Sequence, residues 1–164
     1  MTQHRTPAAL DDLATQYEAT IRRYFDGCNE SDVEKMAACF TEDAVHYFPP
    51  SMYGGAWRGG RFIAERWAHF VETKGSAWTI DRLIVDTRTH EAVIEWTHYK
   101  TAEETMLRGD EWYIFDPETG LISEIRAYYA AAQHAGVAVT ELEDFDYAGR
   151  GYHLSCPVPR PLPA

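Results

Sequence analysis

Proton transfer between side chain and substrate requires an ionisable group held among apolar neighbours, and His98 meets this requirement. His98 lies in a predicted strand, where alternation places it on the same face as Ile94 and Trp96. A neutral imidazole between aromatic walls can accept and return a proton at cellular pH. We therefore take His98 as the candidate proton acceptor, with a structural or surface histidine as the alternative.

Tyr24 is the first candidate donor for stabilising negative charge that develops on a substrate oxygen. It lies on the apolar stripe of a helix that we expect to begin at Asp11 or Asp12. A hydroxyl on such a stripe either faces a cavity or bonds to a backbone carbonyl. Tyr24 is therefore a candidate catalytic residue or a core tyrosine.

Glu111 is the second candidate donor. Strand alternation puts it on the same side as Leu107 and Tyr113. A carboxyl group that loses its water among such neighbours favours the neutral form, which can donate a hydrogen bond. The alternative is a solvated carboxylate or an ion pair with Arg108 or Arg126.

Further residues would bind a substrate without reacting with it. They are large aromatic side chains and one guanidinium, namely Phe48, Trp57, Trp67, Phe70, Trp78, Trp96, Arg108 and Tyr129. Aromatic rings provide apolar binding surface, and a guanidinium suits an anionic group, although a structural ion pair is the alternative for Arg108. His46 shares a strand face with Phe48, so we expect it near the rim of the pocket.

No spacing indicates a metal ion or a nucleotide. His46, His69 and His98 come from separate elements without an H-x-x-x-H or H-E-x-x-H spacing. The three cysteines lack C-x-x-C spacing, and their odd number suits reduced thiols. Neither a glycine-rich phosphate loop nor a G-x-S-x-G turn is present. We therefore expect no metal and no cofactor.

Composition narrows the class of protein further. The 164 residues carry a formal charge of −11, which disfavours nucleic acid and anionic membranes as partners. The chain is 45% hydrophobic and 13% aromatic, enough for a continuous core. The first residues lack an apolar signal core and no stretch is long enough to span a membrane, so we expect a cytoplasmic protein.

The elements that must position these side chains follow a simple order. Two helices precede a strand and a third helix, and four strands follow, with expected ranges of 11–28, 32–40, 44–48, 62–74, 77–86, 91–101, 106–115 and 121–129. This order predicts an α+β fold, in which a curved antiparallel or mixed sheet wraps around the N-terminal helices and leaves a cone-shaped pocket.

We divide the chain into three parts. Residues 1–10 would be a flexible leader, and residues 11–135 the α+β domain. Residues 136–164 form a proline-rich tail that would pack on the domain, the pocket mouth or a partner subunit. Apolar side chains on both faces of the late strands favour a homodimer.

Four segments together resemble a known family. Ile21 to Asp32, Cys39 to Val45, Trp57 to Gly60 and Gly120 to Tyr129 are similar to successive landmarks of the SnoaL-like branch of the nuclear transport factor 2-like superfamily. The resemblance covers about residues 12–132 and implies the cone-shaped fold. Its members include ketosteroid isomerases, polyketide cyclases, limonene-type epoxide hydrolases, dehydratases and non-catalytic binders, so it does not select an activity.

Comparison with individual members of the superfamily tests each activity. The resemblance to ketosteroid isomerases implies an oxyanion-hole role for Tyr24 and Glu111, but their general-base aspartate corresponds to Phe48. The Arg-x-Asp motif of the limonene epoxide hydrolases corresponds to residues 96–98, and their second aspartate to Ala127. Neither mechanism carries over unchanged.

Our leading hypothesis is a cofactor-independent enzyme that eliminates, isomerises or cyclises a small, largely apolar or cyclic metabolite. His98 would accept the proton, while Tyr24 and Glu111 would stabilise the oxyanion. The alternatives are a non-catalytic ligand-binding or assembly domain, and a hydrolase in which His98 and Glu111 hold the attacking water.

Overall fold

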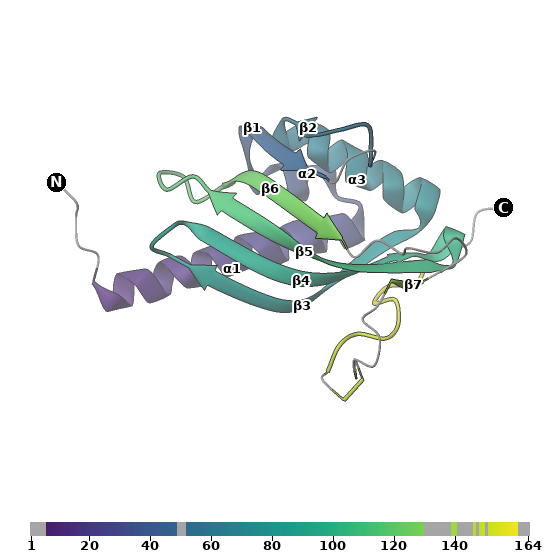
Figure 1. Cartoon of the computed structure of the whole chain (residues 1–164). Helices are drawn as coiled ribbons and strands as arrows, with labels where there is room; N and C mark the ends of the chain where they lie inside the picture. The colour runs from purple at the N-terminus through teal and green to yellow at the C-terminus, as the bar shows by residue number, and fades with distance from the viewer. Residues whose placement is uncertain are drawn as a thin grey trace.

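The computed structural model describes residues 6–48, 52–129, 139–140, 146, 148–149 and 151–160 (Figure 1). The helices in these residues are α1 (Pro7–Glu30), α2 (Val33–Ala37) and α3 (Gly60–Lys74), with a 3-10 turn at Thr101–Glu103. The strands are β1 (Phe40–Tyr47), β2 (Trp57–Arg58), β3 (Ser76–Asp86), β4 (Glu91–Lys100), β5 (Thr105–Phe115), β6 (Ile122–Tyr129) and β7 (Val139–Thr140). The α+β class predicted from the sequence is confirmed.

Helix α1 begins earlier than the sequence indicated. The side chain of Thr6 accepts a hydrogen bond from the backbone N–H of Ala9 at 3.3 Å, so Thr6 is the N-cap. Pro7 follows it at the first helical position, where its missing N–H costs nothing. The helix therefore includes the last four residues of the predicted flexible leader, and the expected start at Asp11 or Asp12 is wrong.

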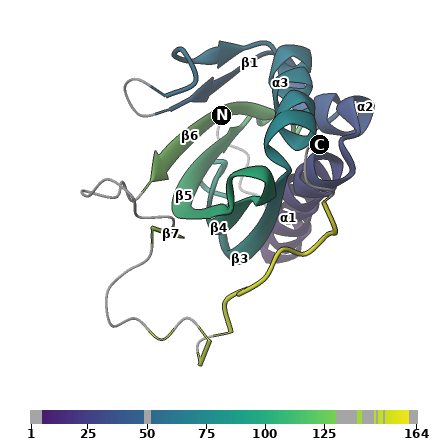
Figure 2. The same cartoon turned by 90° about the vertical axis from the view of Figure 1, so that its right-hand side faces the viewer.

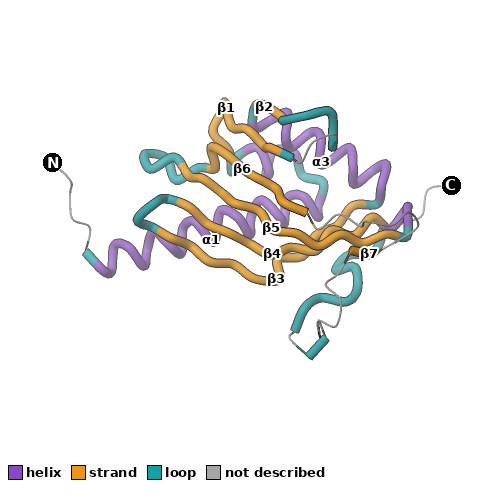
Figure 3. Tube along the Cα trace, in the orientation of Figure 1, coloured by secondary structure: helices purple, strands orange, loops and turns teal. Residues whose placement is uncertain are grey.

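The sheet is mixed and has the strand order β2-β1-β6-β5-β4-β3, with β7 paired to β5. Strands β1 and β6 are parallel, whereas β3, β4, β5 and β6 pair in antiparallel fashion. A shift of register in β3 between Ile80 and Arg82 marks a bulge, which bends a sheet locally. The sheet curves around α1 and α3, and all helices lie on its concave side (Figures 2 and 3).

Strand register fixes which side chains enter the cone. Ile94 lies opposite Glu111 and His98 lies opposite Leu107 in the β4–β5 pair. Ile94, Trp96, His98 and Glu111 are all buried. His98 is four residues beyond Ile94, which corresponds to roughly 13 Å along the strand at about 3.3 Å per residue. His98 and Glu111 therefore lie on the same face of the sheet but far apart along the strands.

The C-terminal residues contact the domain at two places. Residues 139–140 pair with β5, and residues 151–160, which we call the C-terminal strap, run along the side formed by β3 and α1 (Figure 2). Pro49, Pro50 and the alanines after Tyr129 lie outside the described residues. In the part of the chain that is described, no helix combines the length and apolar character needed to cross a bilayer.

Candidate functional site

A buried polar cluster joins β1 to β5 inside the cone. His46 is fully buried, and its Nε2 lies 3.5 Å from Oε1 of Glu111. The other carboxyl oxygen of Glu111 accepts a hydrogen bond from the hydroxyl of Tyr113 at 2.5 Å. Strand β6 separates β1 from β5, so the parallel β1–β6 pairing is what brings His46 to this place.

His46 lacks the hydrogen bonds that a buried imidazole normally makes. Neither of its ring nitrogens has a hydrogen-bond partner among the described residues, because 3.5 Å to Glu111 exceeds hydrogen-bond length. Its ring is instead stacked on Phe48, with centroids 4.1 Å apart, and lies 5.7 Å from the ring of Trp67. Buried polar groups without partners are costly and uncommon in cores. Among the described residues, His46 therefore has no hydrogen bond that would offset the cost of burying its ring nitrogens.

A small cavity lies beside this cluster. Its volume is about 10 Å³, close to the minimum that holds one water molecule. It is lined by Tyr24, Phe25, Cys28, Trp67, Trp78 and Glu111. Burial raises the pKa of the Tyr24 hydroxyl, and the neighbouring Cys28 and Glu111 raise it further. Tyr24 thus stays protonated and can donate a hydrogen bond into the cavity.

The charge of Glu111 affects other hydroxyls on the concave side. Burial raises the pKa of Tyr113, and Glu111 adds to the effect. Burial also raises the pKa values of Tyr53 and Tyr129, with smaller contributions from Glu111. Each of these tyrosines therefore stays protonated and can donate a hydrogen bond, as Tyr113 does to Glu111.

His98 does not join this cluster. Its Nε2 lies 2.8 Å from the hydroxyl oxygen of Ser76, and its ring is stacked on Trp78 with centroids 4.5 Å apart. Burial lowers the pKa of His98 well below its ordinary value, and Lys100 lowers it further. Of the three predicted catalytic residues, the structure brings Tyr24 and Glu111 to one cavity and leaves His98 outside its lining.

The predicted binding aromatics divide into two groups. Trp67 and Trp78 line the cavity. Trp67 also belongs to the second group, an aromatic cluster that it forms with Phe48, Tyr53, Trp57 and Phe70. Neighbouring ring centroids in this cluster lie 4.7–6.1 Å apart. Trp96 packs edge-on against Tyr129 at 5.2 Å. In this structure, most of the aromatic side chains predicted to line a pocket therefore pack against one another and not around an open space.

The predicted pocket position of Arg108 is wrong. Arg108 and Glu111 are three residues apart on β5, so their side chains point to opposite faces. The Arg108 Nη1 donates to the Thr97 hydroxyl at 2.6 Å and lies 3.7 Å from an Asp81 carboxylate oxygen. Its Nη2 donates to the backbone carbonyl of His153 at 3.0 Å. Arg108 thus fastens the strap to the outer face of the sheet.

His46 is the residue that sequence reasoning placed least well. We expected it at the rim, yet it is completely buried. The signal was present in the strand, since Ala44 and Phe48 flank His46 at alternate positions and are both apolar. A polar residue enclosed by apolar ones on one strand face indicates a buried polar site.

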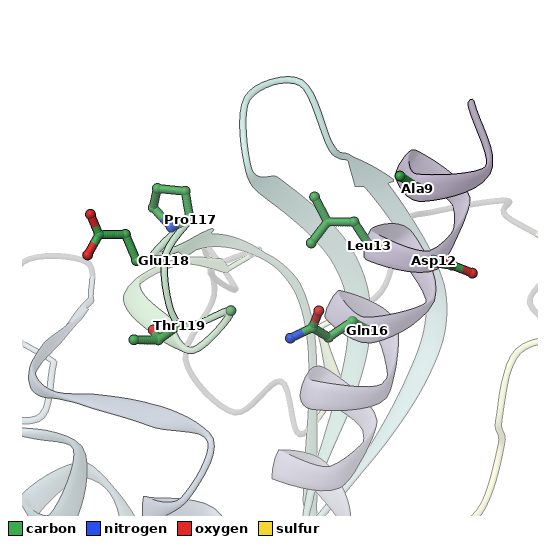
Figure 4. A pocket seen from close by; sticks show the side chains of 8 residues that line it. Ala9, Asp12, Leu13, Gln16, Pro117, Glu118 and Thr119 are labelled. Atoms are coloured by element: carbon green, nitrogen blue, oxygen red, sulfur yellow. The ribbon is translucent and has the colours of Figure 1, made fainter. Parts of the chain in front are cut away.

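A larger hollow lies between the start of α1 and the β5–β6 turn (Figure 4). Its volume is about 390 Å³, and it is lined by Ala9, Asp12, Leu13, Gln16, Pro117, Glu118, Thr119 and Gly120. The carboxylates of Asp12 and Glu118 are exposed to solvent. Nowhere in the described residues are three or more His, Cys, Asp or Glu side chains grouped to hold a metal ion.

The curved sheet, the enclosing helices and the polar cluster inside the cone define a protein of the nuclear transport factor 2-like class. A family model described as the SnoaL-like domain matches residues 21–125, which is more than half of the chain. The chain therefore belongs to the SnoaL-like family. Members of this fold include isomerases, polyketide cyclases and epoxide hydrolases. No curated protein matches the sequence.

Solved structures agree with this assignment. A protein of unknown function with a cystatin-like fold from Methylobium petroleophilum PM1 is 56% identical, with 90% of this chain and 97% of that chain covered and a TM-score of 0.72. An NTF2-like protein of unknown function from Mesorhizobium loti is 20% identical, with 74% and 96% covered and a TM-score of 0.62. An LEH-like epoxide hydrolase from M. tuberculosis is 18% identical, with 71% and 84% covered and a TM-score of 0.58. The last two share the fold.

Proposed function

We propose that this protein is an enzyme that moves protons on a small, largely apolar or cyclic metabolite, in an elimination, isomerisation or cyclisation. The observation that carries the proposal is His46, which is fully buried, has no hydrogen-bond partner in the described chain and faces Glu111 at 3.5 Å. Proton transfer of this kind uses side chains alone, so the proposal requires no cofactor.

Each group in the cluster has a separate role in this proposal. His46 would accept a proton from carbon through its Nε2, which has no hydrogen-bond partner among the described residues and lies 3.5 Å from Glu111, a residue that lines the cavity. Glu111 lies beside the imidazole and stabilises the charge that the imidazole gains. Tyr113 holds the carboxyl group of Glu111 in place, and Tyr24 donates a hydrogen bond to the developing oxyanion. His46 thus replaces His98 as our candidate base.

The test uses carbon acids in heavy water. A panel of cyclic ketones with acidic α-hydrogens is incubated with the protein in D₂O, and deuterium incorporation is followed by NMR. Removing a general base costs on the order of 10²–10⁴ in rate, so His46→Gln should abolish nearly all enzyme-dependent exchange. The matched control is His69→Gln, which changes an exposed histidine on α3 and should retain full activity.

Three outcomes separate the proposal from its rivals. Exchange that persists in His46→Gln would remove His46 from the mechanism. Ligands that bind without any exchange would favour a non-catalytic binding domain, for which the closed aromatic wall is the supporting observation. Incorporation of ¹⁸O from labelled water into product would favour a hydrolase.

A further inference from the structure

We propose that a ligand reaches the buried site through the seam between α1 and β3, and that the C-terminal strap holds this seam closed. The inference rests on the proposed function only in taking the 10 Å³ cavity as the place where the ligand binds. A cavity that holds about one water molecule cannot admit a metabolite unless part of its wall moves. The structure shows which part is thinnest.

The thin part is a wall of two side chains. A surface groove of about 270 Å³ lies outside the seam and is lined by Arg22, Phe25, Asp26, Asn29, Trp78, Thr79, Ile80 and His153. Phe25 and Trp78 also line the inner cavity. These two rings therefore face the groove on one side and the cavity on the other, and their displacement would join the two spaces.

Asn29 fastens the seam beside this wall. Its side-chain amide donates to the backbone carbonyl of Trp78 at 2.8 Å, and its side-chain oxygen accepts from the backbone N–H of Trp78 at 2.8 Å. The end of α1 is thereby held to β3 at the residue that separates the groove from the cavity. Trp78 cannot move outward with its backbone while both bonds are intact.

The strap closes over the same place. Nη2 of Arg160 donates to the backbone carbonyl of Asn29 at 2.5 Å, and Nε of Arg160 donates to the carbonyl of Ser76 at 3.1 Å. One guanidinium thus bridges α1 and β3 across the seam, in the region where the strap passes both elements (Figure 2). Hydrogen bonds from a charged donor are among the stronger ones in proteins.

The other end of the strap is anchored on the outer face of the sheet. The hydroxyl of Tyr152 donates to the carboxylate of Glu95, and the guanidinium of Arg82 lies 4.7 Å from the centre of the Tyr152 ring. Between these anchors, His153 lines the groove. Release of Arg160 would therefore remove one of the two fastenings of the seam, the other being Asn29, while the strap stays attached at Tyr152.

The other sides of the cone are closed more firmly. The aromatic cluster seals the side of β1 and α3, and opening there would separate several ring contacts at once. Near the β3–β4 turn, Tyr17 is stacked on Phe115 with centroids 3.9 Å apart, and its hydroxyl lies 2.6 Å from Nδ1 of His90. Opening the α1–β3 seam requires movement of two rings, release of Arg160 and loss of the two Asn29–Trp78 hydrogen bonds.

Cys28 provides a direct measurement, because it lines the cavity and is only 3% exposed. In full-length protein carrying Cys39→Ala and Cys156→Ser, Cys28 is the single thiol, and its reaction with 4,4′-dithiodipyridine reports opening. Arg160→Met keeps the apolar stem but removes both donors. We expect it to accelerate Cys28 labelling about tenfold, the change in an opening equilibrium that corresponds to ~1.4 kcal/mol.

Two controls make the result specific. Cys39 is 1% exposed and does not line the cavity or the groove, so a protein with Cys39 as its only thiol reports general unfolding. Arg61→Met removes an exposed arginine that pairs with Glu34 away from the seam. We expect neither Cys39 labelling in Arg160→Met nor Cys28 labelling in Arg61→Met to change.

The inference is overturned if Arg160→Met leaves Cys28 labelling unchanged, or if it accelerates Cys28 and Cys39 equally. Thiol labelling needs no catalytic turnover, and deuterium exchange does not depend on which route the substrate takes into the cavity. Failure of the latch would therefore leave the proposed chemistry untouched, and failure of the chemistry would leave the labelling result valid.

Discussion

Replacing His98 should make the protein less sensitive to acid. Burial keeps the pKa of His98 well below its ordinary value of 6.5, so the folded protein resists a proton that the unfolded chain accepts. As the pH falls below 6.5, the unfolded state binds more protons and the free energy of unfolding decreases. The slope is about 1.4 kcal/mol per pH unit, so His98 costs up to about 2 kcal/mol at pH 5.0 while the folded imidazole stays neutral.

The assay is urea unfolding of the parent and of His98→Asn at pH 7.5 and pH 5.0. Other titrating groups are common to both proteins, so the difference between their losses of stability isolates His98. We expect the parent to lose about 2 kcal/mol more than the variant, and His69→Gln, on the exposed face of α3, to behave like the parent. Equal losses in the parent and in His98→Asn would refute the reasoning.

Three further predictions concern packing and assembly. Gly109→Ala should lower the free energy of unfolding by about 1–3 kcal/mol in urea titrations, because a Cβ there would lie 2.5 Å from the carbonyl oxygen of Tyr128. Tyr17→Phe should cost about 1 kcal/mol in the same assay through loss of the bond to His90, and an unchanged midpoint would contradict that bond. Trp112 and Tyr128 are 40% and 55% exposed on the outer sheet face. We propose that they form the contact of a homodimer, and we expect the parent to sediment as a dimer and the variant with Trp112→Lys and Tyr128→Lys as a monomer in sedimentation velocity.

Most of the sheet could be predicted because its strands are runs rich in β-branched and aromatic residues that are bounded by turn residues, with alternating burial in stretches such as 91–96 and 111–115. Each of the strands β3 to β6 differs from its expected range by one residue, at one of its two ends. Strand β1 begins at Phe40, four residues before the expected start at Ala44. The sequence favoured a turn there because Glu42 and Asp43 are residues typical of turns, and both are exposed. Strand β2 lies between glycines, so its sequence favoured a loop, and only pairing with β1 makes it a strand.

The site was harder to predict than the fold, because alternation gives the face of a side chain and not its neighbours. Glu111 and His98 both lie on the concave face, yet their register separates them by several residues. The contact between His46 and Glu111 depends on β1 lying parallel to β6, a long-range pairing that no local pattern in the sequence encodes. The residues that converge are therefore set by topology.

The buried polar cluster is the strongest reason to regard the cone as a functional site. An unpartnered imidazole and a desolvated carboxyl group each reduce stability, on the order of a few kcal/mol for buried polar groups without full compensation. Apolar side chains at positions 46 and 111 would fill the same space without that cost. Local departures from good packing are typical of functional sites, where stability is exchanged for chemistry. The C-terminal strap fits this view, because a reactive site closed to solvent needs a controlled entrance as well as a reactive group.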